Sequence, residues 1–315
     1  MGEIKTNAWP FPHGKQWEED LKRQLTKYFK DKEKPVLARQ PYIIKKRFDS
    51  DWHENVILER VWQYIEEQKK QRHEKNLSFA LHRWIHHGLS SQAFLFNLLG
   101  PLVVDKQWHI FDEILHQTNI QLSTNITNAK FEIEDREVFN ENTGQPTSID
   151  LCLYVGDEEI FIECKFTEKG FGGCSVFTQG DCDGTNPAND FNRCYLHHIG
   201  RCYWKLMKKH GLLSKQVRRD SQCPFSTLYQ LYRLILFALE KNGHFLLIYD
   251  ERNPSFLVEK DNIRRGLFNQ VYELLPANIK NKCHALSVQS IHSVLQRHPE
   301  LDWTNELKEK YFGWM

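Results

Sequence analysis

The sequence predicts a mixed α/β fold, with a central mixed sheet of four to five strands flanked by helices. Helical patterns come first along the chain, three strand patterns follow between residues 129 and 168, and further helices then surround a buried strand pattern at residues 245–249. This order of helical and strand periods is typical of α/β architectures. With 315 residues, 13% of them aromatic, the chain can bury the core of one large domain or two small ones.

Composition argues against several classes of protein. With 42 basic and 41 acidic residues the formal net charge is +1, so any nucleic-acid binding must come from a local patch. The longest apolar run, residues 93–104, is interrupted by Asn, Gly and Pro, so we expect no membrane span. Eight cysteines, with no apolar signal segment at the N-terminus, fit reduced thiols in the cytoplasm.

The first 116 residues carry helical patterns. Residues 1–50 are polar and lysine-rich, and we expect them to form a peripheral arm with one short helix. Ser90 is a suitable N-cap for a helix that Gly100 and Pro101 should close. The expected helices cover Trp17–Phe29, Glu54–Glu74 with a continuation at Leu77–Trp84, Ser91–Leu99 and Asp105–His116.

The period changes near residue 129. Residues 129–138 alternate Phe131 and Ile133 with Glu132 and Glu134, which predicts a strand with one acidic face. A β-hairpin follows at residues 148–168. Its apolar face should carry Ile149, Leu151, Leu153 and Val155 on one arm and Ile160, Ile162, Cys164 and Phe166 on the other, which leaves Asp150, Glu163 and Lys165 on the opposite face.

The length of the hairpin turn decides which of these charges meet. A two-residue turn at residues 156–157 sets Asp150 across from Glu163, whereas a four-residue turn sets Asp150 across from Lys165. A three-residue turn would mix apolar and charged residues on one face. Either even turn therefore brings two carboxylates and one ammonium within about 5–8 Å of one another.

The rest of the chain returns to helices. We expect helices at Arg201–His210, at Thr227–Lys241, near Ile263–Leu275 and from Ile291 onward, with a short strand at His284–Val288. The chain should divide into a helical N-terminal arm (residues 1–75), a core (residues 76–255) with a cysteine-containing loop (residues 169–202), and a C-terminal extension (residues 256–315).

The charged face of the hairpin has the composition of a metal site. Asp150 and Glu163 supply hard oxygen ligands suited to Mg²⁺ or Mn²⁺, and Glu132 or Glu134 could complete the acidic set. Lys165 could orient or help to deprotonate an attacking water, or stabilise negative charge on a phosphate. The alternative is an ordinary cross-strand charge pair on a solvated face; the clean apolar face behind the charges favours the site.

A long loop rich in Gly and Asn carries four cysteines at the spacing C-x7-C-x11-C-x7-C: Cys174, Cys182, Cys194 and Cys202. A structural zinc ion or an iron–sulfur cluster would explain why such a loop should be ordered, with His197 and His198 as alternative ligands. Because no C-x2-C pair is present, four reduced and partly buried thiols are the competing interpretation. Cys152 lies on the charged face, but the sequence places no His beside it to make it a nucleophile.

These residues carry a resemblance to a known family. The hairpin T-S-I-D-L-C-L-Y-V-G-D-E-E-I-F-I-E-C-K-F-T-E (residues 147–168) resembles the active-site hairpin of the PD-(D/E)XK nuclease superfamily, the restriction-endonuclease-like fold. The P-D pair is reduced here to Ile149-Asp150, and the E-x-K is residues 163–165. With S-S-Q at residues 90–92, F-N-L-L-G-P-L at 96–102 and F-E at 131–132, the chain is similar over residues 85–250 to a branch of bacterial proteins assigned as restriction endonucleases.

The resemblance implies hydrolysis of DNA phosphodiester bonds with Mg²⁺ or Mn²⁺. Asp150 and Glu163 would bind the metal, Lys165 would act in catalysis, and Glu132 would be the upstream acid. On the first core helix, where many relatives contribute a further acid, this chain has Gln92. Gln230 lies where superfamily members often place a Gln near the metal or the phosphate, and some nucleases of the superfamily carry a cluster of the kind that the cysteine loop could hold.

Three functions remain open. The first is a restriction- or defence-like DNA endonuclease or exonuclease, in which the basic run at residues 205–219, with Tyr203 and Trp204 nearby, would contact the phosphate backbone. The second is a catalytically degraded nucleic-acid-binding relative, which Gln92 favours. The third is a metal- or thiol-sensing regulator built on the cysteine loop. The sequence leaves the formation of a homodimer open.

Overall fold

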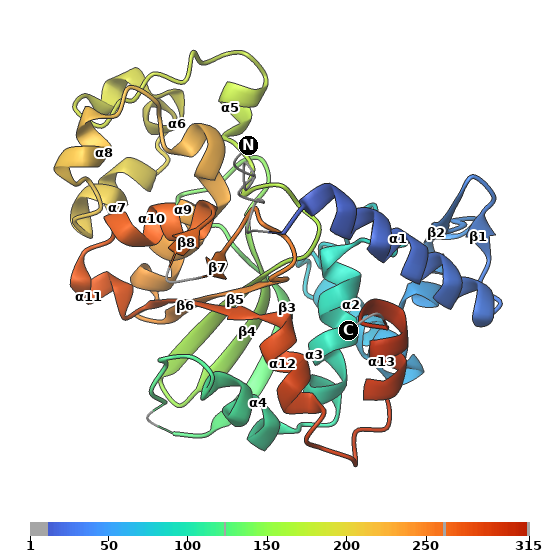
Figure 1. Ribbon diagram of the computed structural model, residues 1–315. Helices are drawn as coiled ribbons and strands as arrows, with labels where there is room; N and C mark the ends of the chain where they lie inside the picture. The colour runs from blue at the N-terminus through green and yellow to red at the C-terminus, as the bar shows by residue number, and fades with distance from the viewer. Residues whose placement is uncertain (1–11, 123, 261–262, 314–315) are drawn as a thin grey trace, which may run out of the picture.

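A five-stranded sheet forms the centre of the computed structural model, which describes residues 12–122, 124–260 and 263–313 (Figure 1). The strand order is β3-β4-β5-β6-β9, with bounds Ile126–Asp135, Thr147–Val155, Glu158–Lys165, His244–Tyr249 and Cys283–Ser287. β3, β4 and β5 are antiparallel to one another, and β6 and β9 run parallel to β5. The predicted mixed α/β fold with a central mixed sheet is confirmed.

Helices cover both faces of this sheet (Figure 1). One layer contains α1 (Gly14–Asp31), α2 (Glu59–Glu74), α3 (Ser91–Val104), α4 (Trp108–Leu115), α12 (Val288–Leu295) and α13 (Thr304–Tyr311). The other layer contains α7 (Tyr203–Lys209), α8 (Lys215–Arg219), α9 (Phe225–Glu240), α10 (Leu267–Leu274) and α11 (Ala277–Lys280).

Short elements lie outside these two layers. They are β1 (Val36–Leu37), β2 (Gln40–Ile44), η1 (Asp49–Asn55), α5 (Ser175–Thr178), η2 (Phe191–Arg193), α6 (Tyr195–His198), β7 (Val258–Lys260) and β8 (Ile263–Arg265). β1 pairs with β2, and β7 pairs with β8. The expected helix near residues 263–275 is therefore a short strand followed by α10.

Two separate hydrophobic cores result, one on each face of the sheet. The first core joins the sheet to α1–α4, α12 and α13, and the second joins it to α7–α11. The helix of the expected peripheral arm belongs to the first core, since Trp17, Leu21 and Leu25 of α1 are buried there. The division of the chain into three parts stays a prediction. No helix of the described ranges has both the length and the apolar character needed to cross a membrane.

The hairpin β4–β5 has the two-residue turn. Val155 pairs with Glu158 across Gly156 and Asp157, and the register continues to Leu151 opposite Ile162. Gly156 has φ of +58°, a conformation that glycine adopts without a steric penalty, at the first position of the turn. The next pair in this register is Asp150 and Glu163.

The apolar residues of β3 and β4 change sides at one level of the sheet. Phe131 and Leu151 pack in the first core, whereas Ile133 and Ile149 pack against the second. Between them lies Glu132, with φ of +51°, which is an uncommon conformation for a residue with a side chain. The prediction that Ile149 shares a face with Leu151 is therefore wrong, because an alternating pattern assumes a regular strand and this one is distorted beside Asp150.

Helix α3 begins as predicted and ends later. The Ser90 side chain accepts a hydrogen bond from the Ala93 amide, which caps the helix. Gly100 and Pro101 do not close it, because α3 continues to Val104. Gly100 serves helix packing instead: a Cβ atom there would lie 2.7 Å from a methyl carbon of Val61 on α2.

The segment 77–84 is irregular, so the predicted continuation of the second helix is wrong. Its backbone is held by a side chain: Gln92 Oε1 accepts from the His82 amide at 2.8 Å, and Gln92 Nε2 donates to the Ala80 carbonyl at 2.8 Å. Polar backbone groups that find such partners do not need helical ones. The segment lies across the end of the sheet that carries Glu163 and Lys165.

Candidate active site

A cleft of about 900 Å³ opens beside the ends of β4 and β5, and we call it the carboxylate cleft. Lys165 is the last residue of β5, and it pairs with Tyr249 at the end of the parallel strand β6. The cleft thus lies at the carboxyl ends of parallel strands, where open α/β sheets place their ligands. Its polar and charged lining includes His82, Arg83, Gln92, Glu132, Ser148, Asp150, Glu163, Lys165, Glu168, Gln230 and Arg233.

Three of the predicted residues form a closed hydrogen-bonded group in this cleft. Lys165 Nζ lies 2.6 Å from Glu163 Oε1 and donates to Gln230 Oε1 at 2.8 Å. Gln230 Nε2 donates in turn to Glu163 Oε1 at 2.5 Å. Gln230 comes from α9, on the second-core side of the sheet, so the helix fixes the positions of both charged groups of the E-x-K motif.

The two other acids lie on the neighbouring strands. Asp150 is half-buried on β4, and its Oδ2 accepts a hydrogen bond from the Cys164 amide at 2.8 Å. Glu132, 4% exposed on β3, accepts from Gln92 Nε2 at 2.7 Å and from Ser148 Oγ at 3.4 Å. The distorted backbone of β3 thus turns this carboxylate toward Gln92 of α3.

The electrostatics of the cleft disfavour three ionised carboxylates. Burial, with the charge of Glu163 adding to it, raises the pKa of Glu132 to about 8. Burial and the charges of Glu163 and Glu132 hold the pKa of Asp150 well above its usual range. Burial also raises the pKa of Glu163, although the Lys165 ammonium opposes this. Positive charge within the cleft therefore falls short of the negative charge that the acids would carry.

Lys165 stays an ammonium ion under these conditions. Burial alone would lower its pKa, but the carboxylates of Glu163, Glu168 and Asp150 raise the pKa above the usual value. A lysine in this state can donate hydrogen bonds and stabilise negative charge, but it cannot accept a proton near neutral pH.

One atom of the cleft lacks a partner. Glu163 Oε2 is buried and forms no hydrogen bond with any described residue, although Glu163 itself is only 1% exposed. A buried carboxylate oxygen without a partner is costly, and it indicates a ligand of opposite charge. The oxygen atoms of Glu163, Asp150 and Glu132 form a donor set of the kind that Mg²⁺ or Mn²⁺ prefers, so the residues present fit a hard divalent cation.

Other predicted residues lie elsewhere. Glu134 is hydrogen-bonded to Ser78 and does not line the cleft. Glu168 does line it, and its Oε2 accepts from the Phe166 amide at 2.8 Å. Cys152 is fully buried in the second core and so is not available as a nucleophile.

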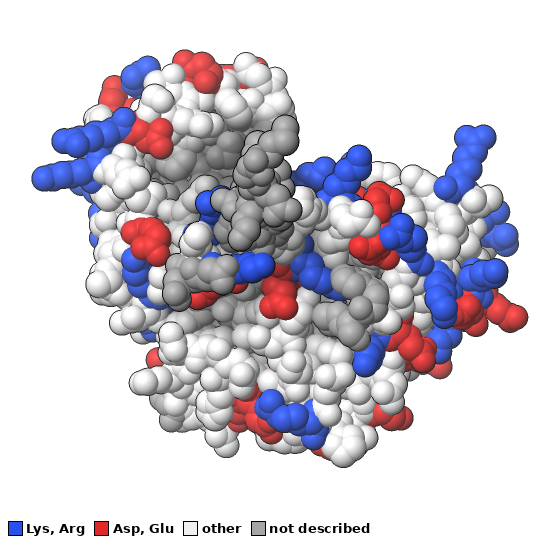
Figure 2. Space-filling view, in the orientation of Figure 1, with Lys and Arg blue, Asp and Glu red and all other residues white. Residues whose placement is uncertain are grey.

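The basic run of residues 205–219 differs from the expectation. Tyr203 and Trp204, which were expected to help contact a nucleic acid, are buried to 2% and 1% exposure in the second core. Arg218 Nη1 donates to the Ala188 carbonyl at 2.8 Å, so it has a structural contact. Figure 2 shows Lys and Arg gathered over α8 and over α1 and the β1–β2 hairpin, with acidic side chains among them.

Several lining residues were not predicted. Ser148 bonds to Glu132, and His82 and Arg83 come from the irregular segment, which was interpreted as helix. Burial lowers the pKa of His82, so its imidazole is neutral near pH 7. The sequence signal was present as the run H-R-W-I-H-H at residues 82–87, in which polar and aromatic side chains alternate without a helical period.

The cysteine loop brings together three of the four predicted thiols and one other. Cys174, Cys182 and Cys194 line a small cavity with Cys223, which lies just before α9. Cys202 does not line this cavity, and its Sγ contacts the Gly200 carbonyl at 3.8 Å. All eight cysteines are free.

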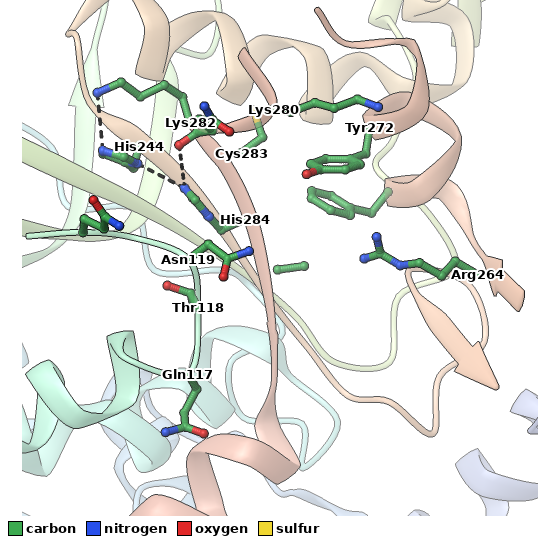
Figure 3. Close-up of a pocket in the computed structure, with 14 residues that line it drawn as sticks. Gln117, Thr118, Asn119, His244, Arg264, Tyr272, Lys280, Lys282, Cys283 and His284 are labelled. Atoms are coloured by element: carbon green, nitrogen blue, oxygen red, sulfur yellow. Dashed lines mark hydrogen bonds between the residues drawn. The ribbon is translucent and has the colours of Figure 1, made fainter. Parts of the chain in front are cut away.

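A second polar cavity, of about 570 Å³, lies at the other end of the sheet (Figure 3). His244 begins β6, and its Nδ1 lies 3.1 Å from Nε2 of His284 on β9. Lys282 Nζ lies 3.3 Å from His244 Nε2. We call this the histidine cavity. Burial lowers the pKa of both His244 and His284 to about 4, so both rings are neutral near pH 7.

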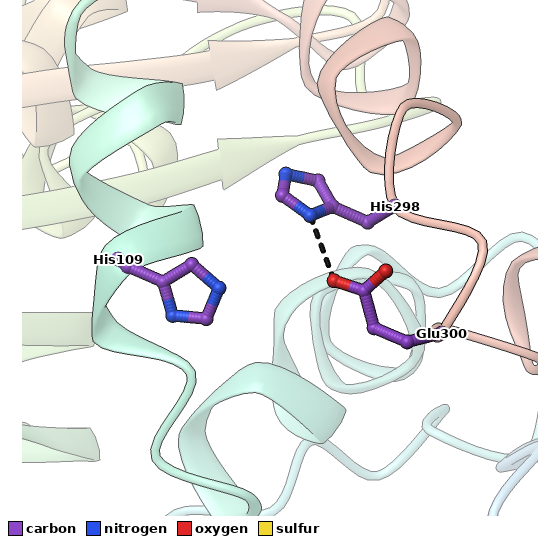
Figure 4. A group of neighbouring side chains, drawn as sticks. All are labelled: His109, His298 and Glu300. Atoms are coloured by element: carbon purple, nitrogen blue, oxygen red, sulfur yellow. Dashed lines mark hydrogen bonds and ion pairs between the residues drawn. The ribbon is translucent and has the colours of Figure 1, made fainter.

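A third group of polar side chains joins α4 to the segment after α12 (Figure 4). The ligand atoms of His109, His298 and Glu300 all lie within 4.8 Å of one another. His298 Nδ1 lies 2.9 Å from Glu300 Oε1, and its Nε2 lies 3.2 Å from Glu113 Oε1. Since His109, Glu113 and Glu300 are not buried, surface ion pairing accounts for this group.

Comparison with known proteins identifies the family. No curated protein sequence matches the chain. Among solved structures, protein VC1899 from Vibrio cholerae matches with a TM-score of 0.26 and 10% identity, over 94% of this chain and 55% of that chain. The chain thus spans about half the length of that protein. A family described as restriction endonuclease associating with ARP matches residues 14–312, which is nearly the whole chain, so this protein belongs to that restriction-endonuclease family.

Proposed function

We propose that the protein is a divalent-metal-dependent nuclease that hydrolyses DNA phosphodiester bonds, with a role in restriction or defence. The observation that carries the proposal is the unpartnered, buried Glu163 Oε2 in a cleft where Asp150 and Glu132 also place carboxylates and Lys165 supplies the ammonium. Membership of a restriction-endonuclease family supports the same reaction and DNA as the substrate.

Each residue of the cleft has a role in this proposal. Glu163 and Asp150, with Glu132, would hold Mg²⁺ or Mn²⁺. When bound, the cation supplies Lewis-acid activation of water and charge neutralisation at the phosphate. Lys165, which keeps its proton, orients the attacking water and stabilises the negative charge of the transition state. Gln230 fixes Glu163 and Lys165 relative to each other through its two hydrogen bonds.

The rim of the cleft offers groups that suit DNA. Trp84 is 45% exposed, and the Arg83 guanidinium lies over its ring at 4.8 Å. An exposed indole can stack on a base, and arginine binds phosphate oxygens. Arg233 of α9 adds a second cation to the lining. These groups surround the acids, so a phosphodiester bound by the rim would lie over Asp150 and Glu163.

A plasmid-cleavage assay tests this function. The wild-type chain should nick or cut supercoiled DNA with Mg²⁺ or Mn²⁺, and a chelator should stop the reaction. Asp150→Asn should be inactive, whereas Asp157→Asn, in the exposed turn of the same hairpin, should cut as the wild type does. Cleavage by Asp150→Asn at the wild-type rate would contradict the assignment.

A second candidate is a DNA-binding protein that does not cleave. The observation in its favour is Gln92, which places an amide rather than a carboxylate on α3 and uses its Nε2 to bond Glu132. Titration with Mg²⁺, followed by calorimetry, separates the two functions. A nuclease should give binding heat that Asp150→Asn removes, whereas a non-cleaving binder should retain DNA without binding Mg²⁺ in the cleft.

A further inference from the structure

Four cysteine thiols meet in one small cavity in the second-core layer, and we call it the thiol cavity. Its cysteines are Cys174, Cys182, Cys194 and Cys223. They come from four separate points of the chain: the residue before α5, the turn after it, the residue before α6, and the residue two before α9. Since chance seldom brings four of eight cysteines together, the arrangement calls for a chemical explanation.

Backbone hydrogen bonds hold the two most distant parts of this cavity together. The Cys174 amide donates to the Phe225 carbonyl at 2.8 Å, and the Cys223 amide donates to the Gly184 carbonyl at 2.7 Å. The Asn186 amide donates to the Ser221 carbonyl at 3.0 Å. The loop that contains Cys174 and Cys182 is therefore fixed against the start of α9, forty residues further along, at the level of the thiols.

The surroundings favour bound thiolates over free thiols. Burial raises the pKa of the Cys223 thiol to about 12, and the other three thiols lie close enough to raise it further. Backbone amides already point at sulfur: those of Phe177 and Val176 hydrogen-bond Cys174, and that of Phe225 hydrogen-bonds Cys223. Hydrogen bonds of this kind stabilise thiolate ligands of a metal centre.

Aromatic side chains close the cavity from the core side. Phe177, Tyr203, Trp204 and Phe225 line it, and Trp204 and Phe225 are 1% and 3% exposed. Four thiols packed against such a wall have few hydrogen-bond partners of their own. A dry, sulfur-rich cavity of this kind suits a soft metal centre.

The spacing of the sulfurs separates a single ion from a cluster. Four thiolates on one zinc ion lie about 3.8 Å apart, from Zn–S bonds of about 2.3 Å in a tetrahedron. No three of the four Sγ atoms, all of them in the described ranges, lie within 4.8 Å of one another. An iron–sulfur cluster spreads its cysteine ligands over two or more irons, so its sulfurs need not converge on one point.

We propose that Cys174, Cys182, Cys194 and Cys223 bind an iron–sulfur cluster. Each thiol loses its proton to solvent as its sulfur bonds to iron, and no other bond of the protein changes. The cluster would be structural: it would tie the loop of residues 174–194 to the beginning of α9. The same helix carries Gln230 and Arg233 to the carboxylate cleft, so loss of the cluster should also loosen that wall of the cleft.

Metal analysis of the whole chain tests the proposal. Protein produced with added iron and purified without oxygen should contain iron and acid-labile sulfide in equal amounts, either two or four of each per chain, with a visible absorption band that dithionite bleaches or alters. Cys223→Ser should lose this iron and sulfide. Cys202→Ser is the matched control and should keep both, because Cys202 lies outside the thiol cavity.

A second variant guards against misfolding of the first. Cys194 is the N-cap residue of α6, and serine is a favourable N-cap, so Cys194→Ser should fold as judged by circular dichroism and still lose the cluster. The proposal is overturned by zinc without sulfide, by a chain that takes up no iron on anaerobic reconstitution with ferrous iron and sulfide, or by loss of iron from Cys202→Ser but not from Cys223→Ser.

Discussion

The carboxylate cleft and the histidine cavity lie at opposite ends of the same strands and treat buried charge in different ways. At the carboxyl ends of β5 and β6, three acids share one ammonium, Lys165, and Glu163 keeps an oxygen without a partner. At the amino ends of β6 and β9, His244 and His284 hydrogen-bond each other, and lysine and arginine line the cavity around them.

Burial acts on both ends but leaves only one of them incomplete. It raises the pKa of Glu132 to about 8 and lowers the pKa of His244 to about 4, so each end disfavours its charged form. The histidines become neutral and bond to each other without further help. The carboxylates cannot do this, because Glu163 stays paired with Lys165 and its second oxygen faces the cleft. The difference indicates that the first end is built to receive a cation.

Replacing the lysine at each end should give the largest contrast. Lys165→Met should reduce DNA cleavage about 10²–10³-fold, because the ammonium that stabilises transition-state charge is lost. Lys282→Met, at the histidine cavity, should change cleavage less than about twofold, because it touches no group of the cleft. Initial rates on plasmid DNA with saturating Mg²⁺ measure both; equal loss in the two variants would remove the functional distinction between the two ends.

Gln230→Ala should have the next largest effect. The variant loses two hydrogen bonds to charged partners, worth about 1.5–3 kcal/mol each, and should cut about 10- to 100-fold more slowly. Its free energy of unfolding should change less than its activity, which chemical denaturation can show. Gln270→Ala, an exposed residue of α10, is the control. Wild-type cleavage by Gln230→Ala would mean that Glu163 and Lys165 hold their positions without the amide.

The histidine cavity should show itself in the pH dependence of stability. Because the folded-state pKa of His244 and His284 is about 4, below the unfolded value of about 6.5, their contribution is fully present above pH 6.5 and is lost as pH falls toward 4. Between pH 7.5 and pH 5 the loss should be on the order of 1–3 kcal/mol. Urea unfolding of a His244→Gln/His284→Gln variant should show a smaller drop than the wild type; an equal drop would assign the effect to other groups.

The smallest effect concerns the backbone that presents Glu132. Arg72 of α2 donates to the carbonyls of Phe131 and Glu132, at 2.5 Å for Phe131, and so holds the strand where φ is positive. Arg72→Ala should lower the free energy of unfolding by about 1–2 kcal/mol. Arg60→Ala removes an exposed pair with Asp105 and should cost less than about 1 kcal/mol. Thermal melts of both variants decide whether the distortion needs this support.

Local patterns were sufficient where a single rule governs the chain. The alternation of the hairpin and its Gly156 turn predicted the register that sets Asp150 across from Glu163, because side-chain period and turn length fix strand pairing. The cap at Ser90 was predicted for a similar reason. The same rules failed at Ile149 and at residues 77–84, where the conformation depends on Glu132 and on the Gln92 side chain, both distant in sequence.

The sequence by itself thus determined the mixed α/β class, the paired strands and the set of acids and lysine on their polar face, since these follow from periodicity and residue chemistry. Only the tertiary structure placed Gln230 of α9 between Glu163 and Lys165, and Cys223 rather than Cys202 beside the loop thiols. Both placements join segments about 30 to 70 residues apart through packing on the second core. No local period encodes such contacts, because they depend on where whole helices lie against the sheet.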